Sequence, residues 1–84
     1  MVCKDFVIRI PGGVQIKTAN KVADIAEKSR SKSLIIIKHN TVNLRSLLNI
    51  LAVGINEGDK VTVTCEGEDE TETMEAILSV LDVD

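Results

Sequence analysis

The chain has 84 residues, of which 44% are hydrophobic and 27% are charged, and its formal net charge at pH 7 is −3. A chain of this length buries only about 60% of the surface that its unfolded form exposes, so we expect one small domain over residues 1–84. Phe6 is the single aromatic residue. Nucleic-acid-binding surfaces are basic, and those that hold single strands use aromatic side chains for stacking, so the composition argues against this class of function.

No apolar run approaches the length of a membrane-spanning helix, and no signal peptide precedes the predicted domain. We therefore expect a cytoplasmic protein that does not contact a membrane. The two cysteines, Cys3 and Cys65, are too few and too far apart for a zinc motif. Both lie in apolar strand patterns, so we interpret them as small core residues with free thiols. A disulfide between them is the alternative that the spacing leaves open.

The first predicted element is a half-buried strand over residues 2–10, because apolar and polar side chains alternate along it. Its apolar side carries Phe6, Ile8 and Ile10. The Pro-Gly-Gly sequence at residues 11–13 ends the strand, and the spacing of the following apolar residues predicts an amphipathic surface helix. The stripe of that helix is formed by Ile16, Ala19, Val22, Ala23 and Ala26.

The middle of the chain predicts a hairpin followed by a short helix. Residues 29–33 are interpreted as a polar connector, residues 34–37 and 41–44 as two strands, and Lys38, His39 and Asn40 as the turn between them. Ser46 is a good helix N-cap, and Gly54 is expected to stop the helix that it begins. Three leucines are more than so short a helix can bury, so we expect an exposed apolar patch. These leucines are Leu47, Leu48 and Leu51.

The last part of the chain predicts a turn over residues 56–59, a strand over residues 61–65 and a terminal helix. The acidic run from Glu66 to Glu75 is interpreted as a solvated loop and first helical turn, with Asp69 and Glu72 forming a capping box. The apolar stripe of the final helix is formed by Met74, Ile77, Leu78 and Leu81. The order β-α-β-β-α-β-α predicts an α+β open-faced sandwich, in which a four-stranded antiparallel sheet carries three helices on one face.

Two segments narrow the prediction further. Residues 13–19, Gly-Val-Gln-Ile-Lys-Thr-Ala, resemble the active-site loop G-L/I-H-x-R-P-A of the HPr phosphocarriers. Residues 41–48, Thr-Val-Asn-Leu-Arg-Ser-Leu-Leu, are close to T-V-N-L-K-S-I-M of low-GC Gram-positive members. The Gly-Ile pair at residues 54–55 and the acidic turn at residues 66–70 fall at the offsets of that family. The chain therefore resembles the HPr family of the phosphoenolpyruvate-sugar phosphotransferase system along its whole length, which implies an HPr-type fold.

The active-site loop departs from the family pattern at three positions. Gln15 stands at the phosphorylated histidine, Lys17 at the arginine and Thr18 at the proline. In the family, helix N–H groups and the arginine fork stabilise the phosphate on the histidine. A glutamine amide cannot act as that nucleophile, and Lys17 lacks the planar fork. The resemblance therefore implies that this chain is not a histidine phosphocarrier, and we interpret His39 as an exposed turn residue rather than a substitute acceptor.

A branch of the family named Crh also has glutamine at the histidine position and keeps only the phosphorylation on serine. In Gram-positive relatives an HPr kinase phosphorylates the serine that matches Ser46, and the product binds a catabolite-control repressor. The resemblance implies the same regulatory phosphorylation for Ser46, although local spacing alone marks this serine only as an N-cap. The expected partner-binding residues are Gln15, Ile16, Lys17, Arg45, Leu47, Leu48 and Leu51.

The alternative is an HPr-like binding module that is never phosphorylated and docks on a phosphotransferase component or another metabolic enzyme. An enzymatic role is not expected, because the sequence has no general base paired with a nucleophile and no metal-ligand cluster. We likewise expect no cofactor and no bound metal.

Overall fold

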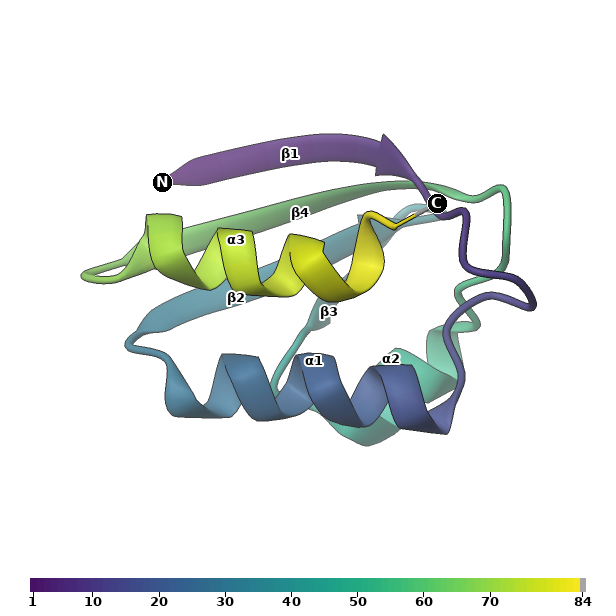
Figure 1. The fold of residues 1–84 in the computed structure, drawn as a ribbon, viewed down its shortest axis with the longest axis horizontal. Coiled ribbons are helices and arrows are strands. Elements are labelled where there is room, and N and C mark those ends of the chain that lie inside the picture. Colours follow the sequence, from purple (N-terminus) through teal and green to yellow (C-terminus); the bar gives the residue numbers. More distant parts are fainter. Residues whose placement is uncertain (84) are drawn as a thin grey trace.

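The computed structural model describes residues 1–83, which form seven elements (Figure 1). In chain order these are β1 (Val2–Val7), α1 (Ile16–Lys28), β2 (Ser31–Ile37), β3 (Asn40–Asn43), α2 (Leu47–Val53), β4 (Lys60–Gly67) and α3 (Glu70–Leu81). All pairings are antiparallel, in the sheet order β1-β4-β2-β3. The predicted α+β open-faced sandwich is confirmed, and α1 and α3 pack side by side beneath the sheet.

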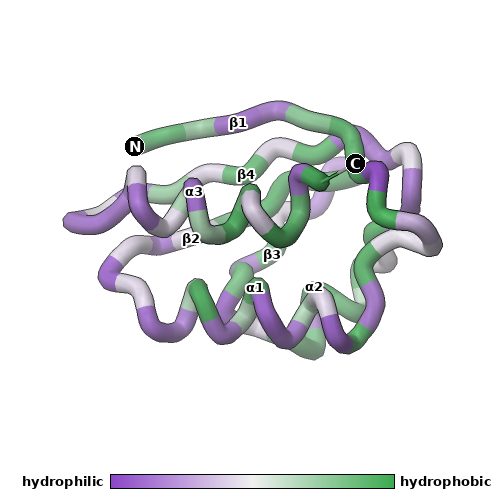
Figure 2. The backbone as a smooth tube through the Cα atoms, in the orientation of Figure 1, coloured by the Kyte–Doolittle hydropathy of each residue, from purple (hydrophilic) through white to green (hydrophobic). Residues whose placement is uncertain are grey.

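The core lies between the sheet and the helices and is aliphatic, as predicted. Burial alternates along β2 and β4, so every second side chain points toward the helices. In Figure 2, apolar and more polar residues alternate along β4. The fully buried side chains include Ile8, Ala19, Ala26, Ile35, Val63, Cys65 and Ile77.

The first strand is shorter than predicted, since β1 ends at Val7 rather than at residue 10. Ile8 bonds to the loop before β4 instead of to the strand: its N–H donates to the Asp59 carbonyl at 2.9 Å, and its carbonyl accepts from the Gly58 N–H at 2.7 Å. The predicted apolar side survives this change, because Ile8 is fully buried and Phe6 and Ile10 pack against the core.

The interpretation of residues 29–33 as a polar connector is wrong for its second half. The strand β2 begins at Ser31, and the side chains of Ser31 and Ser33 are each 1% exposed on the core side. Their hydroxyls have partners there, because Ser31 Oγ donates to Asp69 and Ser33 Oγ lies 3.5 Å from Cys65 Sγ. A hydrogen-bonded hydroxyl can occupy a buried strand position at little cost.

The two cysteines have different environments. Cys65 is buried in the core, as predicted, but Cys3 is exposed, so its interpretation as a core residue is wrong. In the register of β1 with β4, Val2 pairs with Cys65 and Cys3 pairs with Thr64. Adjacent pairs point to opposite faces of a sheet, so the two thiols lie on different faces and both are free.

The predicted capping box at the start of α3 is also wrong. Asp69 is the N-cap residue, but its side chain makes no capping hydrogen bond to α3. The carboxylate is directed instead at the start of β2. The Gly67 N–H donates to Glu70 Oε1 at 3.3 Å, and Glu70 Oε2 lies 2.9 Å from the Met1 ammonium. Part of the acidic run is therefore held in place rather than only solvated.

Candidate functional site

The loop that leads into α1 is fixed against the loop that follows α2. Gly12 and Gly13 adopt positive φ angles of 80° and 77°. The Val14 N–H donates to the Ile55 carbonyl at 2.9 Å, and the Gly12 N–H donates to Glu57 Oε1 at 3.3 Å. The start of α1 and the end of α2 accordingly lie at the same end of the molecule (Figure 1).

Gln15 is the N-cap residue of α1. Its backbone is extended, with φ −107° and ψ −179°, and its carbonyl accepts from the Ala19 N–H at 2.8 Å. Its side chain is exposed and makes no capping hydrogen bond, and the first turn of α1 contains no acidic residue. The positive end of the helix dipole is therefore left with a neutral amide and the exposed Lys17 beside it.

Ser46 occupies the N-cap position predicted for it. Its Oγ accepts from the Asn49 N–H at 3.4 Å, and its carbonyl accepts from the Ile50 N–H at 3.0 Å. The Ser46 N–H donates to the Asn43 carbonyl at 3.0 Å, which fixes the entry to α2. Gly54 ends the helix with φ 72°, as expected. Ser46 is half-buried, and its hydroxyl proton is not needed for the cap.

The exposed apolar patch predicted on α2 is confirmed fully at one residue only. Leu48 is 77% exposed, whereas Leu47 and Leu51 are half-buried and pack against the core. Ile16, at the start of α1, is 64% exposed and so does not join the buried stripe predicted for this helix. Two large apolar side chains at the helix surfaces are thus left without partners within the described part of the chain.

Arg45 has a structural role that the sequence did not reveal. Its Nε donates to the Ala26 carbonyl at 3.1 Å, and its Nη2 donates to the Ser29 carbonyl at 3.1 Å. Both carbonyls lie at the end of α1, where the Ala26 carbonyl also accepts from the N–H and the hydroxyl of the C-cap residue Ser29. Arg45 therefore fixes the end of α1 to the start of α2, which leaves only its remaining N–H groups for a partner.

His39 lies at the tip of the β2–β3 turn, where it is exposed with φ 67°. Residues 1–83 contain no group of three side chains that could hold a metal ion. Nor does any helix in this range have the length and apolar composition needed to cross a bilayer.

A four-stranded open sheet, with a glycine-rich loop leading into its first helix, is the architecture that the resemblance to the phosphotransferase system implied. The family profile described as "PTS HPr component phosphorylation site" matches residues 2–82. The chain therefore belongs to the HPr family of that system.

Individual relatives agree with this placement. The phosphocarrier protein HPr of Mycoplasma pneumoniae is 31% identical over 77 residues, covering 90% of this chain and 88% of the relative. The crystal structure of the Bacillus anthracis HPr has a TM-score of 0.88 at 28% identity, covering 95% of each chain. The Crh structure of Bacillus subtilis has a TM-score of 0.75 at 24% identity, covering 98% of this chain and 94% of that one. This last likeness is one of fold alone.

Proposed function

We propose that this HPr-family protein is regulatory, acts through phosphorylation of Ser46 in the manner of Crh, and is not a histidine phosphocarrier. The observation that carries the proposal is Gln15 at the N-cap of α1, where the resemblance places the phosphorylated histidine of the family. The lone pair of an amide nitrogen is delocalised into its carbonyl, so this side chain has no nucleophile to take a phosphoryl group.

The position of Ser46 supports the second half of the proposal. A phosphate on an N-cap oxygen meets the positive end of the helix dipole and can accept from the first N–H groups of α2. The fold need not change on modification, because the entry to α2 is already fixed by the Asn43 carbonyl. What changes is the surface, where the exposed Leu48 gains a dianion beside it.

The proposed partners follow from that surface. An HPr kinase would supply the phosphate from ATP, and a catabolite-control-type repressor would bind the phosphate together with Leu48. The contacts proposed for it are the ones that the resemblance implies, namely Gln15, Ile16, Lys17, Arg45, Leu47, Leu48 and Leu51. Such a role would place the protein in the cytoplasm with its kinase.

A second candidate is a binding module that is never phosphorylated and docks on a phosphotransferase component or another metabolic enzyme. The exposure of Ile16 and Leu48 favours it, because both side chains are presented without any modification. Apolar side chains of this size near the centre of an interface can carry much of its binding energy.

The experiment is incubation with ATP and the cognate HPr kinase, read by intact mass. We expect one added phosphoryl group, its loss in Ser46→Ala, and its retention in Ser79→Ala, which removes an exposed hydroxyl from α3. An unchanged mass, with a kinase that modifies a Gram-positive HPr in the same tube, would remove the regulatory proposal.

Two further measurements separate the candidates. Capture of the repressor only after phosphorylation favours the regulatory role, whereas capture of a sugar permease component or enzyme I that is insensitive to Ser46→Ala favours the binding module. Acid-labile phosphate on His39 after incubation with phosphoenolpyruvate and enzyme I would contradict both candidates.

A further inference from the structure

A hollow of about 320 Å³ lies at the edge of the sheet, where β2 extends beyond β3. The ladder of β2 with β3 starts at the pair Leu34–Asn43, so the first residues of β2 have no strand beside them on this edge. The chain that leaves β3 crosses the gap and contacts the end of α1 through Arg45. The lining residues are Arg30, Ser31, Lys32, Asn43 and Arg45.

Three of these five residues are cations, in a chain whose formal net charge is −3. Arg45 is held in place by its bonds to the Ala26 and Ser29 carbonyls. A guanidinium has five N–H donors, so three remain for a ligand. Asn43 is also oriented, because its Oδ1 accepts from the Arg45 N–H at 2.9 Å, which leaves its amide N–H groups as donors. Oriented donors lose less conformational entropy when they bind an anion.

The carboxylates near this hollow leave two of its three cations without an ion pair within residues 1–83. Arg30 Nη1 lies 3.4 Å from Glu68 Oε2, but the two side chains are 76% and 72% exposed. An ion pair this open to water is weak and can be exchanged for another anion. Lys32 stands opposite Glu66 in the register of β2 with β4. A third carboxylate, that of Asp69, accepts from the Ser31 hydroxyl and the Arg30 N–H at the same corner. Within residues 1–83 neither Lys32 nor Arg45 forms an ion pair, so these two cations are available to an anion.

We propose that this hollow binds the phosphate group of a small phosphorylated metabolite. A guanidinium fork matches the oxygens of a phosphate, and a lysine adds a point charge to it. The volume is at the lower end of the range of about 300–1,000 Å³ for small-molecule sites, which limits the ligand to a few carbon atoms beyond the phosphate. The proposal does not depend on modification of Ser46.

The test is a titration of the ¹⁵N-labelled protein with glycerol 3-phosphate, read by amide chemical shifts. Because the donors are exposed, we expect saturable shifts at residues 30–32 and 43–45 with a Kd of about 1 mM. Arg30→Gln and Lys32→Gln should each raise that Kd about threefold to fivefold, as expected for loss of one exposed charge contact. Arg45 is not varied, because it also caps α1.

The matched control is Lys60→Gln, which removes the same charge from the opposite end of β4 and should leave the Kd unchanged. Glycerol, and sodium chloride at equal ionic strength, should give no saturable shift. Linear shifts, equal shifts with sodium chloride, or an unchanged Kd in both hollow variants would overturn the proposal. Binding of a phosphoserine peptide but not of glycerol 3-phosphate would also overturn it, since the hollow would then serve a phosphorylated protein.

Discussion

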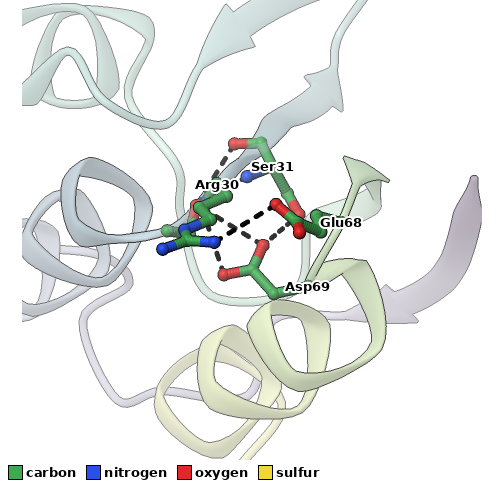
Figure 3. Close-up of polar contacts among 5 residues, drawn as sticks. Arg30, Ser31, Glu68 and Asp69 are labelled. Atoms are coloured by element: carbon green, nitrogen blue, oxygen red, sulfur yellow. Dashed lines mark hydrogen bonds and ion pairs between the residues drawn. The ribbon is translucent and has the colours of Figure 1, made fainter.

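The Ser31 hydroxyl donates a 2.5 Å hydrogen bond to the Asp69 carboxylate across 38 residues of sequence (Figure 3). The Arg30 N–H also donates to the two oxygens of this carboxylate, at 3.2 and 3.1 Å. These bonds join the start of β2 to the N-cap of α3, so they fix the corner where the sheet meets its last helix. They also direct the Asp69 carboxylate toward β2, and this side chain makes no capping hydrogen bond to α3.

Removing the Ser31 hydroxyl should destabilise the fold. Ser31 is 1% exposed, and a hydrogen bond to a charged group contributes more than one between neutral groups. We expect Ser31→Ala to lower the free energy of unfolding by about 1.5 kcal/mol, measured by urea denaturation. Ser79→Ala is the control, because its hydroxyl bonds only to the Ala76 carbonyl within α3 and is exposed. Equal losses of unfolding free energy in the two variants would show that the bond to Asp69 stabilises the fold no more than the exposed bond within α3.

The same corner should make stability depend on acid pH. The Ser31 hydroxyl and the Arg30 amide hold the pKa of the Asp69 carboxyl below its ordinary value of 3.8. The unfolded chain therefore takes up protons first as pH falls through that value, so the stabilisation is complete at higher pH and is lost as pH falls through the folded-state pKa. Urea denaturation between about pH 6 and about pH 2.5 should reveal this decline.

Asp69→Asn is the variant that checks the assignment. Its free energy of unfolding should fall less steeply with acid than that of the unchanged protein. Some slope should remain, because the Asn56 N–H and Lys38 lower the pKa of Asp59, and the Met1 ammonium and the Gly67 N–H lower that of Glu70. An identical slope in Asp69→Asn would assign the acid sensitivity to those two carboxyls alone.

The loop that positions Gln15 should depend on Gly13. Its φ is 77°, and a Cβ built on it would lie 2.4 Å from the Ile55 carbonyl oxygen, so Gly13→Ala should displace the loop from its contact. Gly58 has a φ of 90° but open space around its added Cβ, so Gly58→Ala carries only the backbone strain of about 1–2 kcal/mol. Gly13→Ala should cost about 1–3 kcal/mol more, measured by urea denaturation. Similar losses would mean that the loop can move without consequence.

Restoring the family histidine should not restore the carrier activity. Gln15→His would place an imidazole at the N-cap of α1, but the neighbouring Lys17 offers a point charge instead of a planar fork, and Thr18 stands in place of proline. We expect phosphorylation by phosphoenolpyruvate and enzyme I at least about tenfold slower than that of an ordinary HPr, a loss of about 1.4 kcal/mol in the barrier. Gln15→His combined with Lys17→Arg and Thr18→Pro should recover part of this rate. A normal rate in Gln15→His alone would mean that only the nucleophile was missing.

The sequence by itself determined the elements and the family. Alternation of apolar residues predicted the strands, the stripe from Ala19 to Ala26 predicted α1, and Ser46 and Gly54 predicted the two ends of α2. These signals are local, because they depend on the periodicity of a strand or helix and on the hydrogen-bonding needs of helix ends. The identity of Gln15 is likewise read directly from the chain.

Only the tertiary structure decided which side chains meet across the fold. Local patterns do not reveal which face of β1 the helices cover, so the exposure of Cys3 on the uncovered face was missed. They do not reveal that Ser31 lies beside Asp69, or that Arg45 reaches the end of α1. Each of these contacts depends on the strand order and on where distant segments cross. The fold therefore chooses the partner of a polar side chain, and the neighbouring residues in the sequence do not.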